Sequence, residues 1–133
     1  MTTLESKQIT LNQKPQEVFD FLCDLNKIGS LMPTQVEEFI TDGNSCSFTI
    51  KGMAKLSMEF ESKTPYSEVI LKSAGKVPFD FRLRGLIKDL GDQSVLQLLL
   101  EADLNPFLKM MAEKPLTNFL NLLVDSYEAK SNA

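Results

Sequence analysis

The 133-residue sequence contains no histidine and no tryptophan. Without histidine, the chain has no Ser-His-Asp or Cys-His nucleophile system of its own and no zinc site built on imidazole. It also lacks the side chain that most often serves as a general base near neutral pH. Acid–base chemistry would therefore depend on carboxylates, lysines, tyrosines or thiols with shifted pKa values.

Cysteine is scarce, and long apolar runs are missing. Cys23 and Cys46 are the only cysteines, and neither belongs to a CxxC motif. No apolar run approaches the ~20 residues that a membrane helix needs, and the first ten residues hold no apolar signal segment. We therefore expect a cytoplasmic protein without an integral membrane segment, with both thiols reduced and buried. A Cys23–Cys46 disulfide is the less favoured alternative.

The charge balance is acidic, with 14 Lys and Arg against 18 Asp and Glu and a net charge of −4. A nucleic-acid partner is not expected, because phosphate binding needs a basic stripe. The length, with 43% hydrophobic and 24% charged residues, is typical of a soluble globular protein. It fits a single domain over residues 1–133.

Short elements are predicted at the N-terminal end. Residues 3–11 alternate weakly between apolar and polar, which indicates an edge strand. Pro15 suits the first turn of a helix, where its missing N–H would have no partner. Apolar residues follow it at helical spacing to about Leu25, and a second short helix or turn is expected at 26–31.

From Gln35 the apolar period changes to two, which is typical of strands with one buried face. Asp42-Gly43-Asn44 predicts a hairpin turn, because glycine accepts a positive φ at no steric cost. Strands are expected at 36–41, 45–51, 54–61, 66–73, 77–88 and 94–104.

A long helix is predicted at the C-terminal end. Asn105-Pro106 is a helix start, and a broad apolar stripe runs from there to about Lys130. Pro115 lies within it and predicts a bend near Met111 or Ala112. Only this helix is long enough to cover the apolar face of the meander. The order predicts an α+β fold in which a curved antiparallel sheet of about seven strands surrounds a long C-terminal helix, with two short helices after the first strand.

Several segments carry a family resemblance. KPQEVFDFLCDL at 14–25 resembles the first-helix pattern P-x-E-x-V-[FW]-x-x-L-x-D of the START-like and Bet v 1-like helix-grip (SRPBCC) superfamily, and Met32-Pro33 resembles the stop after the second helix. LNPF at 104–107 and KPL at 114–116 resemble a group of small bacterial members common among Bacteroidetes. The resemblance covers essentially the whole chain and implies the helix-grip fold. It implies function less sharply, because the superfamily includes ligand carriers, cyclases and hydratases.

The inward faces of the expected elements are apolar and contain no acid–base pair. This favours binding of a small hydrophobic molecule, lipid-like or polyketide- or quinone-like, in a cavity of roughly 300 Å3 or more between the sheet and the C-terminal helix. No catalytic residue, metal site or cofactor is predicted. The expected cavity-lining residues are Phe48, Met58, Phe60, Phe79, Phe81, Leu98, Leu100, Met110, Met111, Phe119 and Leu123.

Alternatives stay open at this point. Met110 and Met111 either line an adaptable pocket or simply fill core, and the large side chains of the interior could fill it completely. A cyclase- or dehydratase-like enzyme would need an inward polar pair with perturbed pKa values. A protein-interaction module would use the outer sheet face or a helix for self-association, for example in a homodimer.

Two arginines are expected on the outer sheet face. Arg82 and Arg84 alternate with the inward residues of their strand. Pairing with Glu59, Glu61 or Glu101 on neighbouring strands is favoured over contact with an acidic partner or a lipid headgroup.

Overall fold

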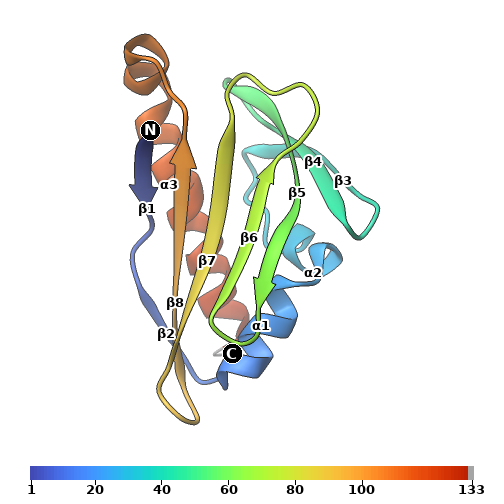
Figure 1. Cartoon of the computed structure of the whole chain (residues 1–133), viewed down its shortest axis with the longest axis vertical. Helices are drawn as coiled ribbons and strands as arrows, with labels where there is room; N and C mark the ends of the chain where they lie inside the picture. The colour runs from blue at the N-terminus through green and yellow to red at the C-terminus, as the bar shows by residue number, and fades with distance from the viewer. Residues whose placement is uncertain (132–133) are drawn as a thin grey trace.

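In the computed structural model, which describes residues 1–131, one antiparallel sheet has three helices packed on one of its faces (Figure 1). The strand order is β1-β8-β7-β6-β5-β4-β3, and β2 also pairs with β8. This arrangement confirms the predicted α+β helix-grip fold. The elements are β1 (Thr2–Glu5), β2 (Ile9–Leu11), α1 (Pro15–Leu22), α2 (Leu25–Gly29), β3 (Val36–Thr41), β4 (Ser45–Ile50), β5 (Ala54–Thr64), β6 (Glu68–Ser73), β7 (Phe81–Asp89), β8 (Ser94–Ala102) and α3 (Pro106–Ser131).

The single strand predicted at 3–11 is two strands, because the chain leaves the ladder at Ser6. The Ser6 backbone N–H donates to the Leu98 carbonyl at 2.9 Å, and its Oγ accepts from the Leu98 N–H at 2.9 Å. A side-chain oxygen thus replaces one backbone acceptor. On one side of this point β1 pairs with β8, and on the other side β2 pairs with it.

The two short helices begin where a carboxylate satisfies free N–H groups. Glu17 accepts from the backbone N–H of Lys14 at 3.2 Å at the start of α1. Asp24 accepts from Asn26 and Lys27 at 3.0 and 3.3 Å at the start of α2. The Asp24 cap starts α2 one residue before the predicted position.

The predicted β3–β4 hairpin is confirmed, with Gly43 at a φ of 96°. Asp42 accepts from the N–H groups of Asn44 and Ser45 at 2.9 and 2.8 Å, and these bonds lower the pKa of its carboxyl. By contrast, β7 begins at Phe81 rather than Val77.

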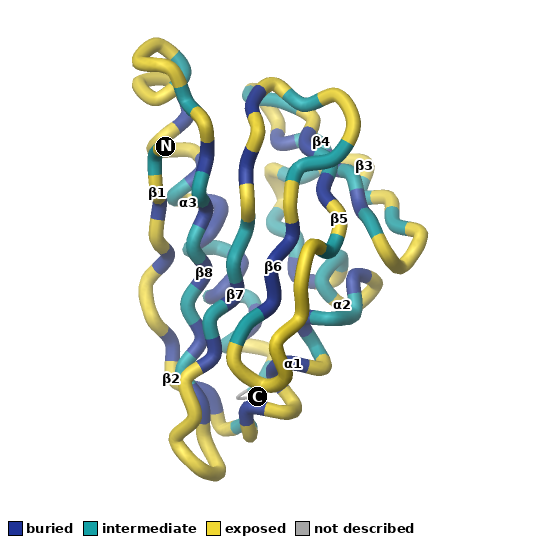
Figure 2. Tube along the Cα trace, viewed as in Figure 1, coloured by how far each residue is buried: buried dark blue, intermediate teal, exposed yellow. Residues whose placement is uncertain are grey.

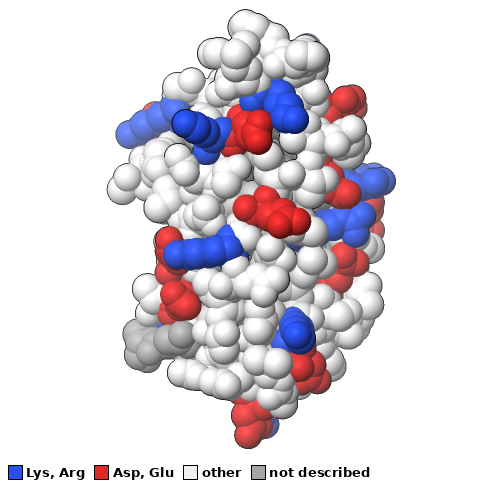
Figure 3. Space-filling model, turned by 90° about the vertical axis from the view of Figure 1, so that its left-hand side faces the viewer, with Lys and Arg blue, Asp and Glu red and all other residues white. Residues whose placement is uncertain are grey.

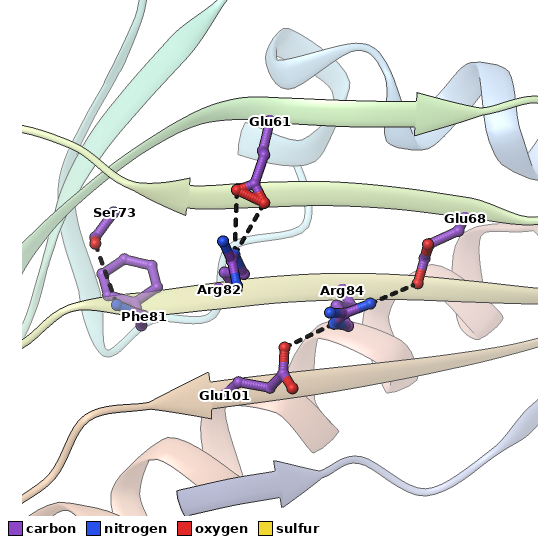
Figure 4. Close-up of polar contacts among 7 residues, drawn as sticks. All are labelled: Glu61, Glu68, Ser73, Phe81, Arg82, Arg84 and Glu101. Carbon is purple, nitrogen blue, oxygen red and sulfur yellow. Dashed lines mark hydrogen bonds and ion pairs between the residues drawn. The ribbon is translucent and has the colours of Figure 1, made fainter. Parts of the chain in front are cut away.

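The outer sheet face carries a ladder of ion pairs across four strands (Figure 4). Arg82 Nε lies 2.9 Å from a Glu61 carboxylate oxygen. Arg84 contacts Glu68 at 3.1 Å and Glu101 at 2.7 Å, and these two carboxylates raise its pKa. The predicted pairing of both arginines with neighbouring glutamates is therefore confirmed for Glu61 and Glu101, with Glu68 as an additional partner.

Helix α3 begins at the predicted cap, where Asn105 Oδ1 accepts from the Leu108 N–H at 2.8 Å. It continues as one helix past Pro115; the predicted bend there stays a prediction. Its buried positions start at Ala112 and repeat every three or four residues to Tyr127. Figure 2 shows buried residues alternating with half-buried ones along β8, which packs against α3. No helix within residues 1–131 is long and apolar enough to cross a membrane.

Candidate functional site: an apolar cavity beneath the C-terminal helix

A cavity of about 50 Å3 lies between the sheet and the C-terminal half of α3. The short helices α1 and α2 form part of its wall. Residues of β5, β6, β7, β8 and α3, together with Leu31 after α2, form the rest of the wall. The lining residues are Leu22, Leu25, Ile28, Leu31, Met58, Val69, Leu71, Leu83, Gly85, Leu96, Leu98, Leu123, Val124 and Tyr127.

The space exists in part because β7 has a glycine at an inward position. Gly85 is buried between the inward residues Leu83 and Ile87 of its strand. A Cβ added to Gly85 would lie 2.9 Å from Cδ1 of Leu22 on α1. Glycine inside a strand often marks a close approach of another group, and here it lets α1 approach the sheet above a small void.

The lining is apolar apart from one hydroxyl group. Tyr127 is 2% exposed, and its OH donates to Gln13 Oε1 at 2.7 Å. Burial, followed by the negative charge of Glu17, raises the pKa of this phenol well above its ordinary value. Tyr127 is therefore neutral at physiological pH, and the lining contains no second titratable group with which it would form an acid–base pair.

Among the predicted ligand-binding residues, Met58, Leu98 and Leu123 line this cavity. They come from β5, β8 and α3 and are 3%, 8% and 6% exposed. The structure brings them together as the alternation of the strands and the helical stripe predicted. Their role in ligand binding stays a prediction.

Most of the other predicted residues are buried but lie away from the cavity, where aromatic rings fill the interior. The rings of Phe48 and Phe119 have centroids 5.6 Å apart, and those of Phe79 and Phe81 are 5.9 Å apart. Leu100 is also buried outside the cavity lining.

Phe60 is only half-buried and lies under the side chain of Lys63, whose Nζ is 4.1 Å from the ring centroid. A cation over an aromatic face is a favourable arrangement at a partly exposed site. The register of β5 against β6 shifts between Phe60 and Ser62, where the simple alternation behind the inward assignment breaks down.

The prediction that Met110 and Met111 line the interior is wrong, as is the alternative that they fill core. They are 77% and 61% exposed, and Phe107 before them is 65% exposed. The first turns of α3 extend beyond the end of β8, so no sheet lies beneath them (Figure 1). Helical spacing identified an apolar stripe, but it does not report how far the opposing sheet reaches.

The sequence prediction missed the contribution of the short helices and of Tyr127. Leu22, Leu25 and Ile28 form the wall opposite the sheet, although the expected site lay only between sheet and C-terminal helix. Two features of the sequence could have located this cavity. One is the glycine at an inward position of β7, and the other is Tyr127, one helical turn after Leu123 on the buried face of α3.

The cavity is smaller than expected. Its volume of about 50 Å3 falls well below the roughly 300 Å3 that is typical of sites for small organic ligands. The interior is thus neither completely filled nor open in this conformation. A ligand of ordinary size has to displace part of the lining.

No protein-family model matches the sequence, and no curated protein matches it. Solved structures do. The protein XoxI from Bacillus cereus superposes with a TM-score of 0.77 at 9% identity, covering 99% of this chain and 96% of its own. A START superfamily protein from Mycobacterium smegmatis gives 0.69 at 15%, covering 98% and 97%. Norcoclaurine synthase from Thalictrum flavum, in complex with dopamine and hydroxybenzaldehyde, gives 0.71 at 13%, covering 96% and 84%.

This chain has the START-like, Bet v 1-like fold. Because the sequence identities are low, these comparisons establish the fold of this chain. They do not transfer the activity of any relative to it. The more specific resemblance to the Bacteroidetes group stays a prediction.

Proposed function

We propose that the chain, acting as one START-like domain over residues 1–133, binds a small hydrophobic molecule between the sheet and α3. The observation that carries this proposal is the residual cavity, whose lining is apolar apart from the Tyr127 hydroxyl. An apolar cavity of this kind excludes water and favours an apolar occupant. The candidate ligands are lipid-like or polyketide- or quinone-like molecules.

The norcoclaurine synthase complex supports the proposal, since a protein of this fold holds two small aromatic molecules. The START superfamily protein from Mycobacterium smegmatis supports the proposal only through its shared fold. In this chain the cavity beneath α3 offers no acid–base pair, so binding is better supported than a cyclase- or dehydratase-like reaction. Neither a metal nor a cofactor forms part of the proposal.

Binding requires the lining to move, because the cavity in its present form is too small. The wall formed by α1 and α2 is the part best suited to this. Helix α2 spans only Leu25–Gly29, and Ile28 within it is only half-buried. Few residues therefore have to shift to widen the site on this side.

The two cysteines support the predicted cytoplasmic location. Cys23 and Cys46 are free thiols; Cys46 is buried as predicted, whereas Cys23 is only half-buried. Two thiols that form no disulfide are compatible with a reducing compartment. A nucleic-acid partner is not part of the proposal, and on the face drawn in Figure 3 basic and acidic side chains are interspersed rather than gathered in a basic stripe.

Native mass spectrometry of the full chain purified from its own host tests the proposal, followed by solvent extraction and identification of any bound molecule. We expect a bound apolar molecule that is released when the protein unfolds. A clean unliganded mass under gentle conditions, together with no binding of added 1-decanol, would contradict it.

Self-association is a second candidate function, favoured by the exposed apolar side chains of Phe107, Met110 and Met111 at the tip of α3. At about 200 Å2 for a side chain of this size, the three expose roughly 400 Å2. A standard interface buries about 800 Å2 per partner, so a dimer formed only through this tip is weak. Light scattering at increasing protein concentration, with Met110→Lys for comparison, tests it.

A further inference from the structure

Tyr127 separates the internal cavity from a second space on the protein surface. Besides lining the cavity, it lines a surface hollow of about 330 Å3 at the C-terminal end of α3. The hollow has a different chemistry from the cavity, because two lysines take part in it. Its lining residues are Gln13, Phe21, Lys27, Tyr127, Lys130 and Ser131.

The partition between the two spaces is a pair of aromatic rings held by one hydrogen bond. The Tyr127 and Phe21 ring centroids are 4.5 Å apart, with their planes at 66°. The Tyr127 hydroxyl donates to Gln13 Oε1 at 2.7 Å, and both hydrogen-bonding residues line the hollow. Rotation of the tyrosine ring away from Gln13 would therefore join the cavity to the hollow without breaking a strand or helix.

The outer hollow has a positive lining. Lys27 lies on α2 and Lys130 on the last turn of α3, and no carboxylate lines the hollow. Lys130 Nζ donates to Ser30 Oγ at 2.9 Å. Lys130 Nζ also lies 5.8 Å from the centroid of the Phe21 ring. Within residues 1–131 neither lysine forms an ion pair, so no carboxylate neutralises the charge of either ammonium group.

We propose that Tyr127 is a gate, and that the joined spaces bind an amphipathic anion. The apolar chain of the ligand occupies the cavity, and its anionic head lies in the hollow between Lys27 and Lys130. This inference rests on the proposed function and adds the ligand class and the entry route. The hollow offers about 330 Å3 to the head group, and the apolar chain still requires the lining of the cavity of about 50 Å3 to move.

The first experiment compares probes of equal chain length that differ only in the head group. We expect the full chain to bind decanoate more tightly than 1-decanol in calorimetric titrations. Decyl phosphate distinguishes a site for phosphate heads from one for carboxylates. Lys27→Gln and Lys130→Gln should each weaken decanoate binding about fivefold, the effect of one charge at about 4 Å in water, and leave decanol binding unchanged.

Lys114→Gln is the matched control, because it removes one lysine from the same helix at the opposite end. Residues 114 and 130 are separated by about 24 Å along a helix, so this variant should bind decanoate as the unmodified chain does. Equal affinities for decanoate and decanol, unaffected by both lysine variants, would overturn the inference while leaving the proposed function intact. Failure of every probe to bind would count against both.

The second experiment addresses the gate itself. Tyr127→Phe keeps the ring and removes the bond to Gln13, so stopped-flow association of decanoate should be about fivefold faster, the usual effect of one neutral hydrogen bond. Gln13→Leu should have the same effect, and the double variant should add nothing further. An unchanged association rate in both single variants would exclude the gate.

Discussion

The interior of this domain has two ends that differ in how completely they are packed. Around the first half of the buried stretch of α3, the ring of Phe119 lies 5.6 Å from that of Phe48 on β4, and Phe81 at the start of β7 pairs with Phe79 at 5.9 Å. Around the second half, mostly aliphatic side chains, with Gly85 and Tyr127, surround a space of about 50 Å3. Both ends use the same sheet and the same helix.

The difference shows that the fold sets the position of the interior and the choice of side chains decides whether space is left in it. Leu98 and Leu100 are successive inward residues of β8, 8% and 5% exposed. Leu98 lines the cavity, and Leu100 does not. Binding, if confined to one end, is a property of a few inward positions and not of the helix-grip architecture as such.

The largest effect is expected from truncating a ring at the filled end. Phe119→Ala should lower the free energy of unfolding by about 3–5 kcal/mol, the usual cost of removing a buried phenylalanine. Met111→Ala, two turns earlier on the same helix, should change it by less than about 0.5 kcal/mol because its side chain is in solvent. Urea unfolding followed by circular dichroism measures both; similar losses would mean that the interior continues to the tip of α3.

A smaller effect is expected from enlarging the two leucines of β8. Leu100→Phe adds volume at a buried position outside the cavity lining and should cost about 1–3 kcal/mol in the free energy of unfolding. Leu98→Phe places the added atoms beside the cavity and should cost less than about 1 kcal/mol. The same urea measurement compares them. If Leu98→Phe proves the more costly of the two, the described difference between the ends is incorrect.

The smallest effect concerns the pH dependence of stability at the cavity end. The raised pKa of Tyr127 means that the folded chain keeps the phenol proton that the unfolded chain loses near pH 10. This contribution is present below pH 10 and is lost as the pH rises from there through the folded-state pKa. Tyr127→Phe should therefore reduce the fall in stability between pH 9 and 11. Thermal unfolding across that range checks it, with Tyr66→Phe as the control, and an identical fall in both variants would exclude the assignment.

Much of the fold could be predicted because it depends on local and periodic signals. The turn at Gly43, the cap at Asn105 and the alternation along β8 each act over a few residues, and all were confirmed. The break at Ser6 could not be predicted, since it depends on a serine hydroxyl that accepts from Leu98 across the sheet.

The candidate site was predictable only in part, for a related reason. Alternation correctly places Met58 and Leu98 on the inward face, but it carries no information on which inward residues touch and which leave a gap. That depends on the approach of α1 to Gly85, where Leu22 lies so close that an added Cβ would be 2.9 Å from its Cδ1. The failure at Met110 and Met111 has the same origin, because the length of the opposing sheet is not encoded in the helix.

The affinity for 1-decanol, measured by methyl chemical shifts in the full chain and in the two β8 variants, tests most directly the claim that an apolar ligand binds at the cavity end. In the unmodified chain we expect the shifts to concentrate on Leu98, Leu123 and Val69. Leu98→Phe should weaken binding roughly tenfold by filling the cavity, and Leu100→Phe should leave it unchanged. Undiminished binding in Leu98→Phe, or methyl shifts confined to Met110 and Met111, would contradict the account.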